Sequence, residues 1–359
     1  MQAQARIQRE ETTMTTGKSY SRRAFLGTAA AGAGLLAAPA TLRAQGVNLR
    51  LHHFNSPLSI AHTEFLVPWA ERLAEATDGE LQIEVFPAMQ LGGKPGDLYG
   101  QAKDGIVDMI WTIPGYTANR FTLTEVFELP FVAKSATKTA PAVHEFAKRN
   151  MGEEYGDTHP ILFHTHAPGQ LHTKGTAIRT LDDMAGLQLR GPSRPITEAI
   201  GTMGATPVGM PVPAVTEAIS RGVVDGAALP WTITRPIRLH EVTDYHTVLD
   251  FYAVVFGMVM NKSRWESLPA DMQQAINDAS SEEFVRELGE LWDGDEAQGR
   301  QMAIDAGNEI IEVSDSERER FREACQPVID NWIETVNERG MDGQALYEEA
   351  LSLIEAQSA

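Results

Sequence analysis

The stretch LRLHHFNSPLSIAHTEFLVPWAERLAEATDGELQIEVFPAMQLGGKPGDLYGQAKDGIVDMIW (Leu49–Trp111) contains the pattern that decides the fold. Its first segment, LRLHHF, and its middle segment, LQIEV, alternate apolar and polar side chains as half-buried strands do. Between them, apolar residues recur at helical spacing until Gly79, a residue type that commonly ends helices. The expected order is strand, helix, strand, helix, strand, over residues 49–54, 57–77, 81–85, 95–104 and 107–111. This order predicts a parallel sheet flanked by helices.

A second unit of the same kind follows. Its expected strands and helices lie at residues 161–166, 187–190, 196–203, 212–221 and 223–229. An uncharged run over residues 252–260 suits a buried strand, and helices are expected from Pro269 onward. Residues 314–317 (SDSE) form a capping-box pattern that opens the last long helical region, in which Pro327 predicts a kink. Two α/β units on one chain predict two lobes with a cleft between them.

Arg190 is the strongest candidate for ligand binding. In LDDMAGLQLRGPSR (Leu181–Arg194) it ends an expected strand, because Gly191 lets a ligand approach and Pro192 stops the strand from continuing. A guanidinium at a strand end offers a rigid fork that can hold a carboxylate with two hydrogen bonds. The alternative is an arginine that caps a surface loop or pairs with a nearby acid.

Aromatic residues and histidines supply further candidates for the pocket wall. Trp111 and Tyr116 follow the third strand, where ligands of open α/β sheets bind, although each could equally belong to the core. His53 ends the first strand, and its alternative is also a structural role. The segment HTHAPGQLH contains His164, His166 and His172, which we interpret as pocket or core residues. A metal site is the alternative, but no carboxylate or cysteine accompanies them at a recognised spacing.

Catalytic motifs are absent from the sequence. It has no P-loop, no HExxH, no nucleophile elbow and no GxGxxG joining a strand to a helix. An enzyme using the cleft would need an acid–base pair, for which Asp225 and Glu217 are candidates by residue type. Asp225 could instead support the turn before Gly226. We therefore expect a binding protein and keep an exported enzyme as the alternative.

Composition narrows the class of partner. The chain has 359 residues, 43% hydrophobic and 22% charged, which is enough for two lobes with separate cores. Its formal net charge of -19 argues against nucleic acid or an anionic membrane surface as a partner, so an anion site must be a local basic pocket. The single cysteine, Cys325, allows no intramolecular disulfide and no iron–sulfur or zinc–thiolate site.

The first 45 residues have the pattern of a twin-arginine signal peptide. Residues 21–26 (SRRAFL) precede an uncharged run over residues 24–38 that is too short and too weakly apolar for a stable membrane span. Ala44 offers a cleavage site before Gln45, and Met14 is an alternative start to Met1. Removing residues 1–44 takes away six basic and two acidic residues and moves the net charge from -19 to -23. A chance Arg-Arg pair in an N-terminal tail is the alternative interpretation.

The phrase GLQLRGPS around Arg190 resembles the lKGlKiR signature of the solute-binding proteins of TRAP (tripartite ATP-independent periplasmic) transporters, the DctP family. Five further blocks resemble that family in the same order, and together they cover nearly the whole chain after residue 46: residues 77–93, 107–112, 128–132, 204–230 and 261–276. The resemblance implies a two-lobe periplasmic binding protein fold with a hinge and a central ligand cleft. It also implies that Arg190 binds the carboxylate of the ligand.

The resemblance also implies the bounds of the two lobes and the character of the ligand pocket. It implies one lobe from residues 46–167 with about 255–295, and a second from residues 168–254 with about 296–359, including bracing helices. Gln170 and Leu229 stand where the sialic-acid-binding branch has an arginine and an asparagine, which weakens the case for a sugar acid. With Trp231 beside Leu229, an apolar or aromatic monocarboxylate is the expected ligand, although Trp231 could instead pack between the lobes. The expected ligand-binding residues are Arg190, Gln170, Trp231, Leu229, Trp111, His53, Tyr116 and His172.

The resemblance also implies a mechanism and partners. The ligand carboxylate pairs with Arg190, the lobes close over the ligand, and the closed form is delivered to TRAP permease subunits in the membrane. No enzymatic activity, cofactor or nucleic acid is expected, and the protein is expected in the periplasm. A protein that presents its ligand to a sensor would have the same sequence features.

Overall fold

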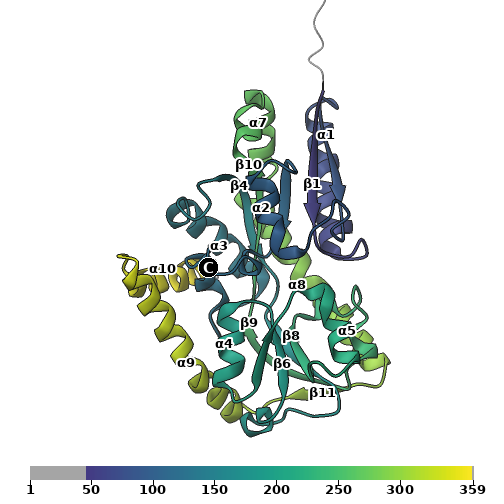
Figure 1. Ribbon diagram of the computed structural model, residues 1–359, viewed down its shortest axis with the longest axis vertical. Helices are drawn as coiled ribbons and strands as arrows, with labels where there is room; N and C mark the ends of the chain where they lie inside the picture. Colours follow the sequence, from purple (N-terminus) through teal and green to yellow (C-terminus); the bar gives the residue numbers. More distant parts are fainter. Residues whose placement is uncertain (1–45, 358–359) are drawn as a thin grey trace, which may run out of the picture. The chain divides into compact units, whose positions relative to one another are not determined.

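The structure is a computed structural model that describes residues 46–357 (Figure 1). The predicted signal peptide, with its twin-arginine motif and both candidate start codons, lies outside the described residues. Within residues 46–357, no helix combines the length and the apolar character needed to cross a membrane.

The first sheet has the parallel βαβαβ core that the sequence predicts. Strand β1 (Val47–His53) pairs in parallel with β2 (Leu81–Phe86) on one side and β3 (Met109–Thr112) on the other. The alternation that predicted β1 is visible in its burial, since Leu49 and Leu51 are buried and Arg50 between them is exposed. Strand β10 (Val255–Asn261) then runs antiparallel between β3 and β4 (Thr158–Thr165), giving the order β2-β1-β3-β10-β4.

The second sheet has six strands in the order β11-β9-β5-β8-β6-β7. Strand β6 pairs in parallel with β7 and β8, whereas β5 runs antiparallel to both β8 and β9. The bounds are β5 (Gly169–Thr173), β6 (Gln188–Gly191), β7 (Thr206–Gly209), β8 (Gly226–Leu229), β9 (Tyr245–Tyr252) and β11 (Glu309–Glu312).

Several predicted bounds differ from the structure. The expected strand at 223–229 begins only at Gly226, because residues 222–225 form a turn in which the Asp225 N–H donates to the Gln188 carbonyl at 2.7 Å. The uncharged run at 252–260 is divided, since β9 ends at Tyr252 and β10 begins at Val255. A uniformly apolar run does not show where one strand ends and the next begins, because both strands are buried there.

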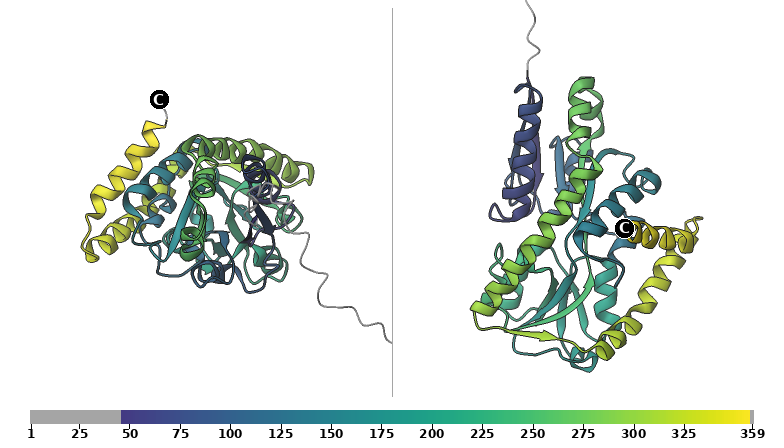
Figure 2. Two further views of the ribbon diagram at one scale, coloured as in Figure 1. Left: turned by 90° about the horizontal axis from the view of Figure 1, so that it is seen from above. Right: turned by 180° about the vertical axis from the view of Figure 1, so that it is seen from behind.

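Helices cover the sheets and complete the chain. After a π-helical segment at Ala61–Leu66, the α-helices are α1 (Val67–Ala76), α2 (Leu98–Lys103), α3 (Ala136–Asn150), α4 (Arg194–Thr202), α5 (Val215–Ser220), α6 (Lys262–Glu266), α7 (Ala270–Asp278), α8 (Glu282–Asp305), α9 (Asp315–Glu338) and α10 (Gly343–Ala356). Helix α8 is long enough to contact elements of both sheets, namely β4 and β11 (Figure 2).

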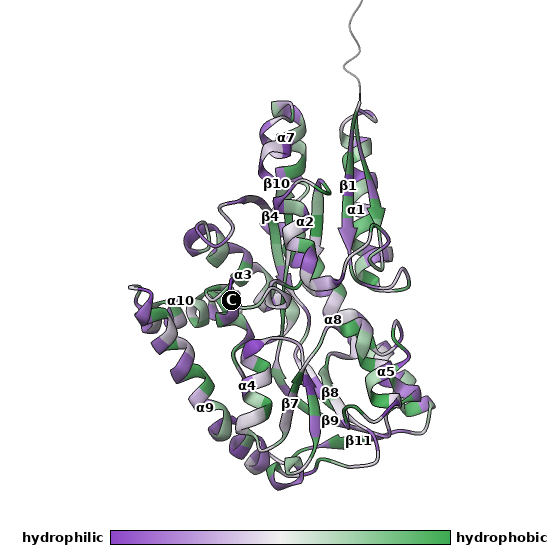
Figure 3. Ribbon diagram, in the orientation of Figure 1, coloured by the Kyte–Doolittle hydropathy of each residue, from purple (hydrophilic) through white to green (hydrophobic). Residues whose placement is uncertain are grey.

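Helix α9 shows how the late helices attach. It mixes hydrophilic and hydrophobic residues along its length (Figure 3), and its buried side chains recur every three or four residues: Phe321, Cys325, Val328, Trp332 and Val336. Its predicted capping box is only half formed. The Ser314 hydroxyl accepts from the Glu317 N–H at 3.3 Å, but the Glu317 carboxylate instead accepts from the Leu181 N–H at 2.9 Å. The helix continues through Pro327.

The two sheets are joined by short segments. Residues 166–168 connect β4 to β5, and residues 253–254 connect β9 to β10. The Tyr252 ring crosses Gly169 at this junction so closely that a Cβ on Gly169 would lie 2.3 Å from the ring. Glycine is therefore required at position 169, where one connecting segment passes the other.

Candidate ligand-binding pocket

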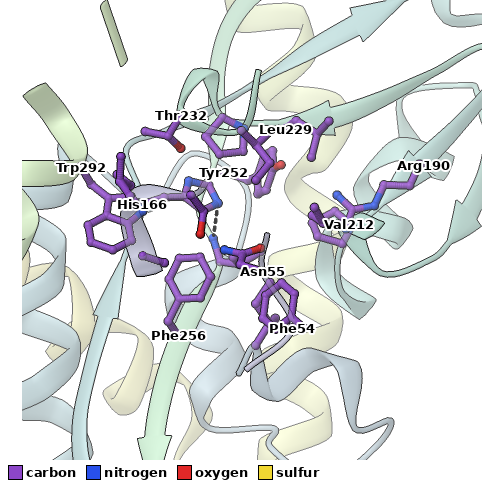
Figure 4. A pocket seen from close by; sticks show the side chains of 18 residues that line it. Phe54, Asn55, His166, Arg190, Val212, Leu229, Thr232, Tyr252, Phe256 and Trp292 are labelled. Atoms are coloured by element: carbon purple, nitrogen blue, oxygen red, sulfur yellow. Dashed lines mark hydrogen bonds between the residues drawn. The ribbon is translucent and has the colours of Figure 1, made fainter. Parts of the chain in front are cut away.

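A pocket lies where the connecting segments meet the ends of strands from both sheets (Figure 4). The first sheet contributes residues that follow β1 and β3, the second contributes the ends of β6, β8 and β9, and α8 closes one side. Most of the wall is apolar or aromatic, including Phe54, Ile60, Ile113, Leu229, Phe256 and Trp292. Among the described lining residues, Arg190 carries the only formal charge.

Arg190 is fully buried at the end of β6. Its Nε donates to the Met210 carbonyl at 2.8 Å and its Nη1 donates to the Ala228 carbonyl at 2.9 Å. These two carbonyls fix the plane of the guanidinium, whereas Nη2 has no hydrogen-bond partner among the described residues. A buried N–H of a charged group left without an acceptor is energetically costly, so this side chain is prepared to bind an anion.

No carboxylate within residues 46–357 forms an ion pair with Arg190. The buried acid Glu128 and the half-buried acid Glu296 are engaged elsewhere: Glu128 accepts from the Val255 N–H at 2.9 Å, and Glu296 accepts from two N–H groups after β8. Burial raises the pKa of each to about 8, which favours their neutral forms at pH 7. The positive charge of Arg190 is therefore available to a ligand.

The aromatic wall has a second layer behind it. Trp111 stacks between Phe54, at 5.5 Å between ring centroids, and Phe256, at 4.6 Å, and both of these rings line the pocket. Its indole Nε1 donates to His164 Nε2 at 3.0 Å. His53 lies beside Trp111, and its Nε2 is 3.1 Å from Nδ1 of His62. Trp111 and His53, expected at the ligand, thus support the wall from behind.

Gln170 makes its contacts outside the pocket, whereas Tyr116 lies beside two residues of the pocket wall: its ring is edge-on to Phe54 at 5.3 Å between centroids, and burial raises the pKa of its hydroxyl, a rise that Arg190 opposes. Gln170 Oε1 accepts from the N–H groups of Leu249 and Asp250 at 2.8 and 3.0 Å, and its Nε2 donates to the Pro168 carbonyl at 2.9 Å. All its polar atoms are used by the protein. The Tyr116 hydroxyl accepts from the Val212 N–H at 3.1 Å, and its ring lines a neighbouring outer cleft.

Leu229 lines the pocket, whereas the adjacent Trp231 does not. Trp231 packs against α8, where a Cβ on Gly299 would lie 2.0 Å from its carbonyl oxygen, and its ring lies edge-on to His172 at 5.0 Å. His172 donates from Nε2 to the Leu229 carbonyl at 2.9 Å and accepts at Nδ1 from Nδ1 of His246 at 2.6 Å. Burial holds the pKa of His172 well below its usual value. The structure therefore brings together Arg190 and Leu229 from the predicted set.

The alternatives of metal binding and acid–base chemistry find no matching cluster. No three His, Cys, Asp or Glu side chains within residues 46–357 gather as a metal site. Asp225 accepts from the Gln188 N–H at 2.7 Å, as a turn-supporting residue would, and Glu217 pairs at the surface with Arg221. Neither acid lines the pocket.

Sequence reasoning missed several lining residues, among them Asn55, Thr232, Tyr252 and Trp292, whereas His166 lines the pocket and had been interpreted as a pocket or core residue. Asn55 could have been found, because it follows β1 at the carboxyl end of a parallel strand. His166 accepts at Nε2 from the Val254 N–H at 3.1 Å and donates from Nδ1 to the Ala167 carbonyl, so it presents a neutral ring to the pocket. Its burial lowers the pKa to about 4. Trp292 lies in a helix with no local signal of function.

Residues 51–335 match the bacterial extracellular solute-binding proteins of family 7, the DctP family. The chain belongs to this family. It is 38% identical to a TRAP solute-binding protein from a marine metagenome, which is specific for aromatic acid ligands and was solved with metahydroxyphenylacetate; the match covers 87% of this chain and 100% of that one, with a TM-score of 0.85. It is 40% identical to a TRAP solute-binding protein from Rhodoferax ferrireducens solved with copurified benzoate, over 87% of this chain and 98% of that one, also with a TM-score of 0.85.

A curated relative in the DctP family is the C4-dicarboxylate-binding periplasmic protein of Rhodobacter capsulatus, 26% identical over 74% of this chain and 81% of that protein. These matches confirm the predicted family and the two-sheet α/β fold. The chain is thus a solute-binding protein of the TRAP type, a class that works with membrane permease subunits.

Proposed function

We propose that this TRAP solute-binding protein captures an aromatic monocarboxylate, with Arg190 holding the carboxylate and the apolar wall holding the ring. The observation that carries the proposal is the free Nη2 of a fully buried Arg190, in a pocket whose other described lining residues are all uncharged. One cation matches one carboxylate, and a second carboxylate would be buried without a partner. The aromatic acids bound by the two relatives support the same ligand class.

Capture is proposed to occur by closure of two lobes, formed by residues 46–167 with about 255–295 and by residues 168–254 with about 296–359. Each lobe would contain one of the two sheets, and the pocket draws its walls from both. A ligand can reach a fully buried Arg190 only if the walls separate. Closure then removes water from the carboxylate–guanidinium pair and strengthens it.

Two further parts of the proposal concern location and chemistry. The protein is proposed to reach the periplasm by the twin-arginine route, in keeping with the SRRAFL motif at residues 21–26 and with the periplasmic name of the Rhodobacter relative. It is proposed to release its ligand unchanged rather than to act as an enzyme. Recovery of the bound acid after prolonged incubation, analysed by chromatography, tests this point.

The carboxylate clamp is tested by calorimetry on residues 46–359 with benzoate and with benzamide, its neutral counterpart. We expect benzoate to bind and benzamide to bind at least about thirtyfold more weakly, since a charge-assisted hydrogen bond contributes about 2 kcal/mol. The variant Arg190→Gln should lose benzoate to a similar extent. Its matched control is Arg221→Gln, an exposed arginine paired with Glu217 outside the pocket, which should bind as the parent does.

The comparison of ligands keeps the test decisive even if Arg190→Gln folds poorly. Equal affinity for benzoate and benzamide would contradict the carboxylate clamp. Binding of neither, together with binding of a sugar acid or a dicarboxylate, would contradict the proposed ligand class.

A further inference from the structure

The pocket has a second polar end, on the side opposite Arg190. Figure 4 shows Trp292 and Thr232 on that side, with Leu229, Tyr252, His166 and Asn55 drawn between them and Arg190. Both residues line the pocket and both are buried, with 3% and 7% of their surfaces exposed. Within residues 46–357, no hydrogen bond to another residue involves the indole N–H of Trp292 or the hydroxyl of Thr232, and neither atom is fully closed off from the pocket.

Helix α8 holds this pair in place. Trp292 belongs to α8, and its ring packs edge-on against His164 at 4.8 Å. One helical turn later, Glu296 accepts from the backbone N–H groups of Trp231 and Thr232 at 3.2 and 3.0 Å. The segment after β8 is thereby tied to the helix, so the two free side-chain groups keep a fixed position relative to each other.

The chemistry of the pair matches a hydroxyl group. An indole N–H can only donate, whereas a threonine hydroxyl can accept as well as donate. A phenolic hydroxyl could accept from Trp292 and donate to Thr232 at the same time. A second carboxylate does not fit, because no cation lies among the described residues at this end. An unsubstituted ring would leave both groups without partners, apart from any water that remains.

We propose that Thr232 and Trp292 form a subsite for a hydroxyl on the aromatic ring, placed away from the carboxylate. This proposal rests on the proposed function, because it assumes that Arg190 holds the carboxylate. It narrows the ligand from aromatic monocarboxylates in general to those with a meta or para hydroxyl. A hydroxyl ortho to the carboxylate would stay beside Arg190 and could not reach the subsite.

The test is a calorimetric comparison of benzoate with its 2-, 3- and 4-hydroxy derivatives. We expect the 3- or 4-hydroxy acid to bind about tenfold more tightly than benzoate, as one net hydrogen bond allows, and the 2-hydroxy acid to show no such gain. In Thr232→Val, which removes the hydroxyl at nearly constant shape, the ratio of the affinity for the 3- or 4-hydroxy acid to the affinity for benzoate should fall below threefold. Trp292→Phe should reduce the gain in the same way.

Thr234→Val is the matched control. Thr234 is fully buried two residues away, its hydroxyl is also unpartnered, and it does not line the pocket, so this variant should keep the full gain. Benzoate binding without any gain for the 3- or 4-hydroxy acid would overturn the subsite and leave the proposed function standing. A gain that survives in both Thr232→Val and Trp292→Phe would also overturn it. If none of the four acids binds, the proposed function itself fails, and the subsite with it.

Discussion

Arg190 could be predicted from its place at a strand end, but its neighbours in the pocket could not. Trp111 lies in β3, whose four residues are all buried, so the alternation of the strand cannot tell which face meets the ligand. The rings that line the pocket, Phe54 and Phe256, come from segments about 200 residues apart, and only the fold brings them to either side of Trp111. Local sequence therefore indicated the clamp residue and only an approximate location for the aromatic wall.

A substitution of Gly169 should weaken both the packing of the protein and its binding of the ligand. A Cβ at this position would lie 2.3 Å from the Tyr252 ring, which lines the pocket, so Gly169→Ala must displace that ring. We expect a loss of about 1–3 kcal/mol in the free energy of unfolding, measured with urea, and weaker benzoate binding. Gly294→Ala is the control, because nothing lies within 4 Å of its added Cβ within α8, and it should stabilise the protein slightly. A Gly169→Ala variant as stable as the parent would contradict this packing.

At the scale of the element, helix α8 both braces the fold and contributes Trp292 to the polar end of the pocket. The sequence predicted helices from Pro269 onward but gave α8 no role at the site, because its buried residues read simply as an amphipathic face. Glu296 is the exception, as a half-buried acid that anchors the 3₁₀ turn Trp231–Ile233. Its role depends on a contact across 64 residues of sequence, which no local pattern contains.

Burial raises the pKa of Glu296, and likewise of Glu128, from 4.5 to about 8. Between these values the folded protein holds protons that the unfolded chain has released, so the free energy of unfolding should fall as pH rises from about 4.5 to about 8. Glu296→Gln removes one of these groups and should make the fall shallower, as measured by urea unfolding at pH 5 and pH 8. Glu290→Gln, at an exposed position of the same helix, should leave the fall unchanged. An identical pH dependence in parent and Glu296→Gln would contradict the assignment.

At the scale of the whole molecule, the order of strands allowed two α/β units to be predicted, but the strand expected at residues 161–166 to open the second unit was wrongly assigned, because β4 (Thr158–Thr165) is an edge strand of the first sheet. The sequence did not reveal how the sheets are joined, because the connecting residues 166–168 and 253–254 carry no turn signal beyond Pro168. These short connections are also where the pocket lies. The pocket thus follows from the topology, and its lining could be identified only once the chain was folded.

Opening of the molecule can be tested with a reversible lock. Gly115 follows β3 and Ser193 precedes α4, and a Cβ on Gly115 would lie 2.8 Å from the Ser193 Cβ, so the two segments need to separate by only about 1 Å to reach the Cβ–Cβ distance of a disulfide. We expect a Gly115→Cys, Ser193→Cys double variant to bind benzoate far more slowly when oxidised and at the parental rate when reduced, as measured by stopped-flow fluorescence. The native Cys325 is buried in α9 and should not interfere. Unchanged kinetics after oxidation would mean that the ligand enters without separation of these segments.

The connecting segments themselves form part of the pocket wall, since His166, Tyr252 and Val254 all line it, so a ligand bound as proposed would touch them. The size of the ligand and the movement of the connecting segments would therefore both act on these same residues. An acid whose ring carries a bulky group would still engage Arg190 but would hold the connections apart. Such a compound would occupy the binding protein without producing the closed form, and it would therefore block uptake. Compounds of this kind would compete with the natural ligand without being transported themselves.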